Sequence, residues 1–108
     1  MALLHIKNTQ YSNEITALVL QKLVHIPGIT GKKMFGGSGL MYHEKMFGLV
    51  DSKGNCFIKA DRETIPTLTD LGGEQHSRMP YYSVSENNLK NAKNVIILVE
   101  HAIKISQQ

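Results

Sequence analysis

Residues 33–59 read KMFGGSGLMYHEKMFGLVDSKGNCFIK, and this stretch decides the fold. Three short apolar runs alternate there with polar turn sequences: one ends at Tyr42, one spans residues 46–50 and one spans residues 56–59. Short strands joined by polar turns, with no helix between them, predict an antiparallel meander. The glycines around Ser38 predict a turn or a sharply bent strand where the meander begins.

An amphipathic helix pattern precedes the meander. It covers residues 12–26, with Ser12 as the predicted N-cap and the pair Pro27-Gly28 as the end of the helix. The apolar residues that recur at helical spacing are Ile15, Leu18, Val19, Leu23 and Ile26. We therefore expect this helix to pack one face on the sheet.

Shorter elements follow the meander. Asp61 is placed to cap a short helix over residues 62–71, which a glycine pair then ends. Residues 74–80 are polar and predict a loop or the start of a strand. Residues 81–84 are aromatic and β-branched, which favours an extended segment.

The C-terminal region predicts a helix over residues 87–105. The run over residues 95–99 fits a strand equally well by propensity, but the apolar periodicity continues to Ile103 and favours the helix. The stripe consists of Ala92, Val95, Ile96, Val99, Ala102 and Ile103. Three apolar residues lie off the stripes of the first and last helices and predict a second apolar face that would suit a homodimer: Leu20, Ile97 and Leu98.

The order of these elements predicts an α+β fold. We expect an antiparallel sheet of four to five short strands, with an N-terminal helix, a short middle helix and a C-terminal helix packed on it. The 108 residues suffice for one domain, which we place over residues 1–108 with its core over residues 12–104.

Composition narrows the class of protein. A hydrophobic content of 42% with 19% charged residues is ordinary for a globular chain and argues against disorder. No window approaches the ~20 apolar residues that a membrane span needs, and the N-terminal apolar run is too short for a signal peptide. The single cysteine, Cys56, fits a reducing compartment, so we expect a cytoplasmic protein that avoids membranes. We interpret Cys56 as a small buried hydrophobe, with a reactive thiol as the alternative.

Charge is unevenly distributed along the chain. Residues 1–60 contain seven lysines and three acidic residues, whereas residues 61–108 contain five basic and six acidic residues. A basic half suits a polyanion partner such as DNA or RNA, although scattered lysines more often form a solvated surface. The lysines that such binding would use are Lys32, Lys33, Lys45, Lys53 and Lys59.

No motif of known chemistry is present in the sequence. The glycines over residues 28–33 lack the Walker spacing, and those over residues 36–39 lack the dinucleotide fingerprint. The five histidines do not pair at the spacing of a zincin motif, and no acid–base dyad follows from spacing. We therefore predict no catalytic, cofactor-binding or metal-binding residue and expect a protein that is not an enzyme.

Several motifs follow one another in a characteristic order: KMFGGSGLMY at residues 33–42, MFGLV at 46–50, CFIKAD at 56–61, LGG at 71–73 and MPYYSV at 79–84. This succession resembles the TfoX N-terminal domain family, from about residue 12 to residue 104. Two departures are visible. Ser38 stands where the family usually has an aromatic residue, and the segment between Gly73 and Met79 is shorter than the hairpin often found there.

The resemblance implies an α+β domain of a regulator that promotes competence genes together with the cyclic-AMP receptor protein. It supplies no catalytic residue or ligand. We expect a non-enzymatic protein-interaction domain in transcriptional regulation, with a partner in the transcription machinery. Alternatives are a weak DNA- or RNA-binding domain and a small-ligand-binding domain. The residues expected to form the interaction surface are Lys32, Lys33, Phe35, Gly36, Gly37, Gly39, Tyr81 and Tyr82.

Overall fold

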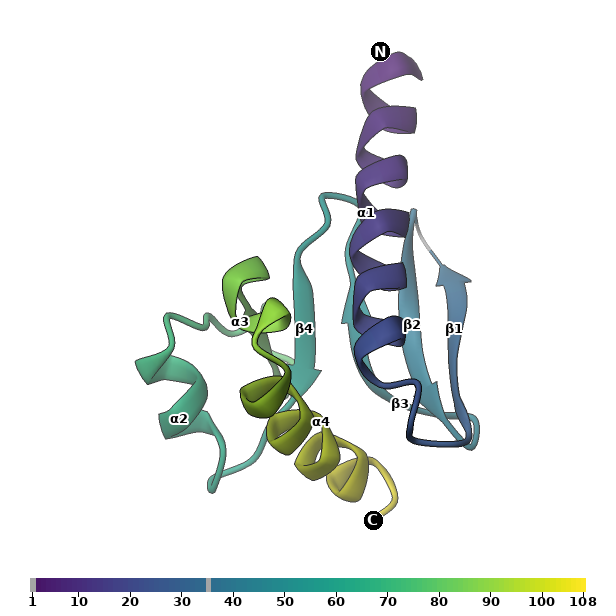
Figure 1. Cartoon of the computed structure of the whole chain (residues 1–108). Coiled ribbons are helices and arrows are strands. Elements are labelled where there is room, and N and C mark those ends of the chain that lie inside the picture. Colours follow the sequence, from purple (N-terminus) through teal and green to yellow (C-terminus); the bar gives the residue numbers. More distant parts are fainter. Residues whose placement is uncertain (1, 35) are drawn as a thin grey trace.

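One antiparallel sheet organises the chain in the computed structural model, which describes residues 2–34 and 36–108 (Figure 1). Side chains are described for all of these except residues 2–9, 92, 94 and 95. Five strands lie in the order of the sequence, so each strand pairs with its neighbour in the chain. They are β1 (Ile29–Met34), β2 (Gly37–Tyr42), β3 (Lys45–Val50), β4 (Cys56–Lys59) and β5 (Tyr81–Val84). The predicted α+β class and the antiparallel meander are confirmed.

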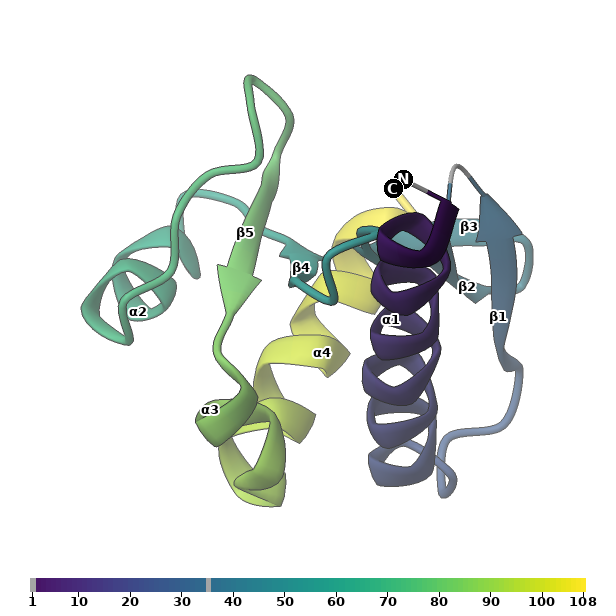
Figure 2. The same ribbon diagram turned by 90° about the horizontal axis from the view of Figure 1, so that it is seen from above.

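Helices cover one face of this sheet, which we call the inner face; the opposite face is the outer face. The helices are α1 (Ala2–Lys22), α2 (Ile65–Asp70), α3 (Glu86–Lys90) and α4 (Ala92–Ser106). Helix α1 packs against β1 and β2, and α4 packs against β3 and β4. Figure 2 shows both helices on one side, while the loop before β5 rises on the other. The outer face is therefore left without a helix among the described residues.

The core lies between the inner face and the two long helices. Leu40 and Phe47 from the sheet, Val19 from α1 and Val99 from α4 are all almost completely inaccessible to solvent. Burying a side chain of this size contributes about 1.5–3 kcal/mol relative to leaving it exposed. Packing of the helices on the sheet is thus the main source of stability.

Strand register separates the two faces residue by residue. Leu40, Gly48 and Ile58 lie opposite one another across β2, β3 and β4, on the inner face. Their neighbours Gly39, Leu49 and Phe57 form the adjacent row, on the outer face, because side chains alternate along a strand. A β-bulge follows Leu40, where Met41 pairs with Met46. The bulge accommodates one extra residue, Phe47, which is buried in the core.

The first helix is longer at its start and shorter at its end than predicted. It begins at Ala2 instead of residue 12 and ends at Lys22 instead of residue 26. Ser12 is therefore not an N-cap: it lies inside α1, fully buried, and its hydroxyl has no hydrogen-bond partner among the described residues. Ala-Leu-Leu at residues 2–4 favours helix strongly enough to extend it past the capping signal.

The short middle helix begins later than predicted, at Ile65. Asp61 does act as a cap, but of the turn before the helix, where its carboxylate accepts from the backbone N–H of Glu63 at 2.9 Å and of Thr64 at 3.3 Å. Pro66 lies in the first turn, where its missing N–H costs little. Gly72 has a φ of +88° and ends the segment, as the glycine pair predicted.

The predicted last helix is in fact two helices, which meet at an extended Asn91. Ser85 caps α3 by accepting from the Asn88 N–H at 3.2 Å. The break lets Leu89 of α3 and Leu98 of α4 both reach the core, so placing Leu98 on a second apolar face was wrong. Ile97 does lie outward, at 68% exposure. The side chains of Ala92 and Val95 in the predicted stripe lie outside the described residues.

None of the helices in the described part of the chain combines the length and the apolar character that crossing a bilayer requires.

Candidate functional site

The outer face of the sheet carries an apolar groove of about 390 Å³. Met34 at the end of β1, together with Met46 and Leu49 of β3, lines one side. His76 and Met79, from the loop before β5, line the other. We call this hollow the methionine groove.

The loop over residues 74–80 forms a firmly held wall of the groove. Its two ends are tied together, because the Glu74 N–H donates to the Ser83 hydroxyl at 2.8 Å and the His76 N–H donates to the Tyr81 carbonyl at 2.8 Å. The His76 ring packs on Phe57 of β4, with 4.5 Å between ring centroids. Although short, this segment forms a hairpin that brings Met79, 41% exposed, to the groove.

Two glycines of β2 lie beneath the groove for different reasons. A Cβ on Gly37 would overlap the Val50 carbonyl of β3, so only glycine permits this approach of the strands. A Cβ on Gly39 would meet only the flexible ends of Met34 and Met46, at 3.2 and 3.3 Å. Gly37 is thus fixed by the backbone, whereas Gly39 leaves room for the methionine side chains.

Two basic residues belong to the elements that form the groove, although neither lines it. Lys32 pairs with Gly39 in register and lies on the outer face with Met34, two residues on. Arg78 precedes Met79 in the loop and is exposed. Asp51 is the one acidic residue among the described residues that line the groove. Its carboxylate accepts hydrogen bonds from the Lys53 and Asn55 N–H groups at 3.0 and 2.9 Å and from the Asn55 side-chain amide at 3.1 Å.

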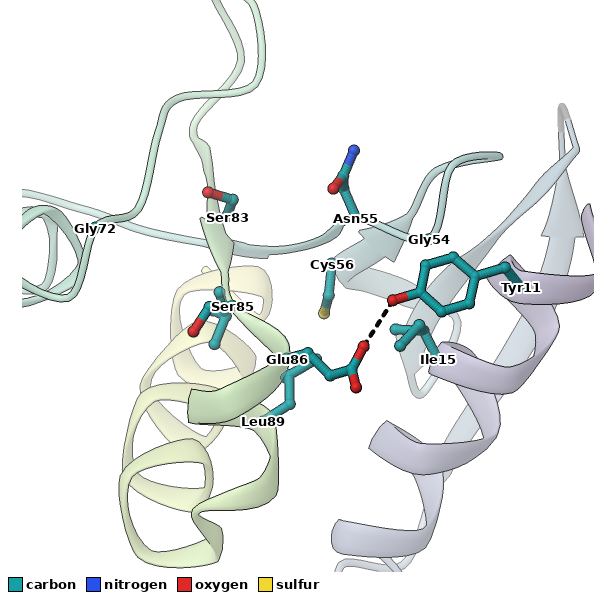
Figure 3. Close-up of a pocket in the computed structure, with 11 residues that line it drawn as sticks. Tyr11, Ile15, Gly54, Asn55, Cys56, Gly72, Ser83, Ser85, Glu86 and Leu89 are labelled. Atoms are coloured by element: carbon teal, nitrogen blue, oxygen red, sulfur yellow. Dashed lines mark hydrogen bonds between the residues drawn. The ribbon is translucent and has the colours of Figure 1, made fainter. Parts of the chain in front are cut away.

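A second, smaller hollow of about 170 Å³ lies between α1, α3 and the start of β4. Figure 3 shows Tyr11 of α1 reaching towards Glu86 of α3, and the Tyr11 hydroxyl donates to the Glu86 carboxylate at 2.6 Å. This bond raises the pKa of Tyr11, and together with Lys90 it lowers the pKa of Glu86. Cys56 lines the same hollow, and burial raises the pKa of its thiol to about 12. The thiol is therefore protonated at neutral pH, which confirms the interpretation of Cys56 as a buried hydrophobe.

A hydrogen-bonded contact between His101 and Asp61 ties α4 to the turn before α2. The His101 Nε2 lies 3.1 Å from the Asp61 carboxylate and 3.9 Å from that of Glu63. The hydrogen bond to His101, with those from the Glu63 and Thr64 N–H groups, lowers the pKa of Asp61. Among the side chains that the structure describes, no cluster of three histidine, cysteine or acidic groups could hold a metal ion. The contact joins two elements of the fold.

Comparison with protein families gives one match: the model of the TfoX N-terminal domain covers residues 21–106 of the chain. That range is nearly the whole sequence. The chain belongs to the TfoX N-terminal domain family. A comparison with curated proteins found no significant match.

Every residue that lines the methionine groove falls inside the part of the chain that matches the TfoX N-terminal domain. The second hollow differs, because its Tyr11 precedes the matched range, as does most of α1. The groove is therefore built from the TfoX domain alone, and we take it as the candidate functional site.

The structure of this TfoX domain brings some of the predicted surface residues together. Gly37 lines the groove, and Gly39 lies next to the ends of its methionine side chains, opposite Lys32. Gly36 makes the tight turn before β2 with a φ of +79°. Phe35 lies outside the described residues.

Other predicted surface residues lie elsewhere. Lys33 is on the inner side of β1, opposite Ser38. Tyr82 packs against the core. Tyr81 is buried, and its hydroxyl donates to the Met46 carbonyl at 3.5 Å, so it supports the strand that carries Met46.

The lysines of the basic half do not gather into one patch in the TfoX domain. Lys32 and Lys33 lie on opposite faces of β1. Lys45 is the first residue of β3, and Lys53 lies in the turn after that strand. Sequence reasoning missed the residues that line the groove, namely Met34, Met46, Leu49, His76 and Met79. The recurrence of methionine in the run of motifs was the available signal, since three of its four methionines line the groove.

Proposed function

We propose that this TfoX N-terminal domain is a non-catalytic protein-interaction module that acts in transcriptional regulation. The observation that carries the proposal is the methionine groove on an open sheet face. Its volume of about 390 Å³ falls in the range of natural binding pockets, about 300–1,000 Å³.

Methionine side chains suit protein recognition at such a surface. The unbranched thioether is polarizable and adopts many shapes, so it is favoured where a surface must adapt to a partner. Met34, Met46 and Met79 come from three separate segments of the chain and meet at one hollow. An apolar hollow held open by a hydrogen-bonded hairpin is typical of a binding surface.

Family membership supplies the setting for this module. The TfoX resemblance implies a regulator of DNA-uptake competence that works with the cyclic-AMP receptor protein, so the proposed partner belongs to the transcription machinery. The open sheet face would then be the contact between the regulator and that machinery.

Binding to defined components tests the proposal. The purified domain is immobilised and exposed separately to cyclic-AMP receptor protein and to RNA polymerase, while light scattering measures its own mass. Saturable binding to either component supports the function. If neither binds and fluorescence anisotropy instead shows salt-sensitive binding of DNA, the protein-interaction function is wrong and the nucleic-acid alternative replaces it.

A further inference from the structure

We propose that the methionine groove receives one bulky apolar side chain from an acidic segment of a partner protein. The inference rests on the proposed function and goes further, since it names the site and the chemistry of the partner. It follows from three features of the groove: its apolar lining, its satisfied backbone and its basic surroundings.

The backbone beneath the groove leaves little for a partner to hydrogen-bond. Strand β2 lies between β1 and β3 and pairs with both along its length. The main-chain groups of Gly37 and Gly39 are therefore engaged in the sheet. A partner gains affinity here mainly by burying apolar surface against Met34, Met46 and Met79. A bulky apolar side chain such as leucine or phenylalanine offers the most apolar surface to bury there.

The surroundings of the groove favour negative charge on the partner. Lys32 lies on the outer face of β1, opposite Gly39, and the exposed Arg78 precedes Met79 in the loop. Neither makes an ion pair within the part of the chain that the structure describes. The Asp51 carboxylate is already occupied by three donors of its own turn. These two cations outnumber the one carboxylate among the described residues that line the groove, so its surroundings complement a segment with acidic residues on either side of its apolar anchor.

Selection from a displayed library of random 12-residue peptides tests the inference without a known partner. We expect enriched peptides to carry one leucine, phenylalanine, methionine or tryptophan flanked by aspartate or glutamate. The best of them is then synthesised with a fluorophore, and its Kd is measured by anisotropy against the wild type and paired variants.

The first pair of variants tests the apolar lining. Met79→Asp places a charge in the groove and should weaken binding by at least about tenfold, because a charge must be desolvated there. Val24→Asp makes a similar change at an apolar residue that is 83% exposed on the turn after α1, and it should leave the Kd unchanged. Both sites are exposed, so neither change should unfold the domain, and Met34→Ser gives an independent loss at the groove.

The second pair tests the basic surroundings of the groove. Lys32→Glu should weaken binding by about two- to fivefold, as expected for an exposed ion pair, and should reduce its dependence on salt. Lys33→Glu changes the same charge on the next residue of the same strand, but on the inner side, and should have no effect.

Each failure has its own meaning. Selected peptides without the acidic and apolar pattern, or with equal affinity for Met79→Asp, overturn the inference. A transcription component that binds wild type and Met79→Asp equally upholds the protein-interaction function but overturns this site. Self-association that Met79→Asp abolishes, with no peptide bound, assigns the groove to a second copy and also overturns the inference.

Discussion

The two faces of the sheet are formed by the same strands but serve different purposes. The inner face presents Leu40 and Ile58 to the helices, and both are almost fully buried. The outer face presents Leu49 and Met46, one residue away from inner-face positions, to a groove. Because side chains alternate along a strand, the residues that stabilise the fold lie on one face and the residues proposed to bind a partner lie on the other. Truncation of side chains on the inner face should destabilise the domain, whereas changes to the exposed side chains of the groove should alter mainly what it binds.

The largest effect is expected on the inner face, from Phe47→Ala. Phe47 has no exposed surface, and deleting a buried phenyl ring costs about 3–5 kcal/mol of the free energy of unfolding. Urea denaturation followed by circular dichroism measures it. A loss below about 1 kcal/mol would mean that the bulge residue is not part of the core.

The next effect separates two glycines of one strand. Gly37→Ala pushes a methyl group into the Val50 carbonyl and should cost about 1–3 kcal/mol, whereas Gly39→Ala meets only movable methionine ends and should cost less. Thermal unfolding of both variants gives the difference. Equal losses would show that the strands do not approach each other as described.

Ser12→Ala should raise stability by about 1 kcal/mol, because it removes a buried hydroxyl without a partner and places a better helix former inside α1. Urea denaturation of the variant checks this gain. A loss of similar size would indicate that the hydroxyl is hydrogen-bonded after all.

Met79→Asp should leave the free energy of unfolding within about 0.5 kcal/mol of the wild type, since Met79 lies on an exposed loop position. The same urea experiment, run beside the binding measurement, makes the contrast with Phe47→Ala direct. A large destabilisation would mean that the outer face also contributes to stability.

The smallest expected effect is on the stability of the domain at acidic pH. Hydrogen bonds from His101 and from two backbone N–H groups hold the pKa of Asp61 below its usual value. The carboxylate therefore adds stability above its unfolded pKa, and this stability is lost as pH falls through the lower folded value. Asp61→Asn should flatten the fall in Tm between about pH 5 and pH 3. An unchanged acid profile would show that these hydrogen bonds to Asp61 contribute nothing to stability.

Sequence patterns predicted the inner face better than the outer. Leu40, Ile58 and the stripe of α1 follow simple periodicities, so their burial could be anticipated. The bulge at Phe47 changes the alternation within β3, and no local signal marks it. The extended Asn91 divides a continuous helical pattern because two leucines must reach one core, which is a tertiary effect.

The groove was harder still to predict. It joins residues of β1, β3 and the loop over residues 74–80, which are distant in the sequence and become neighbours only through the sheet order. Three residues of the predicted interaction surface, Lys32, Gly37 and Gly39, lie on the outer face of β1 and β2. The separation of Lys32 from Lys33 depends on which face each residue of β1 takes.

We expect the outer face of the sheet to bind the partner and the helix-covered inner face not to bind it. Methyl-¹³C labelling of methionine followed by NMR, during titration with the best selected peptide, tests it most directly. We expect shifts of the Met34, Met46 and Met79 methyl signals that saturate with the same Kd as anisotropy. Saturable binding that leaves these three signals unmoved would contradict it.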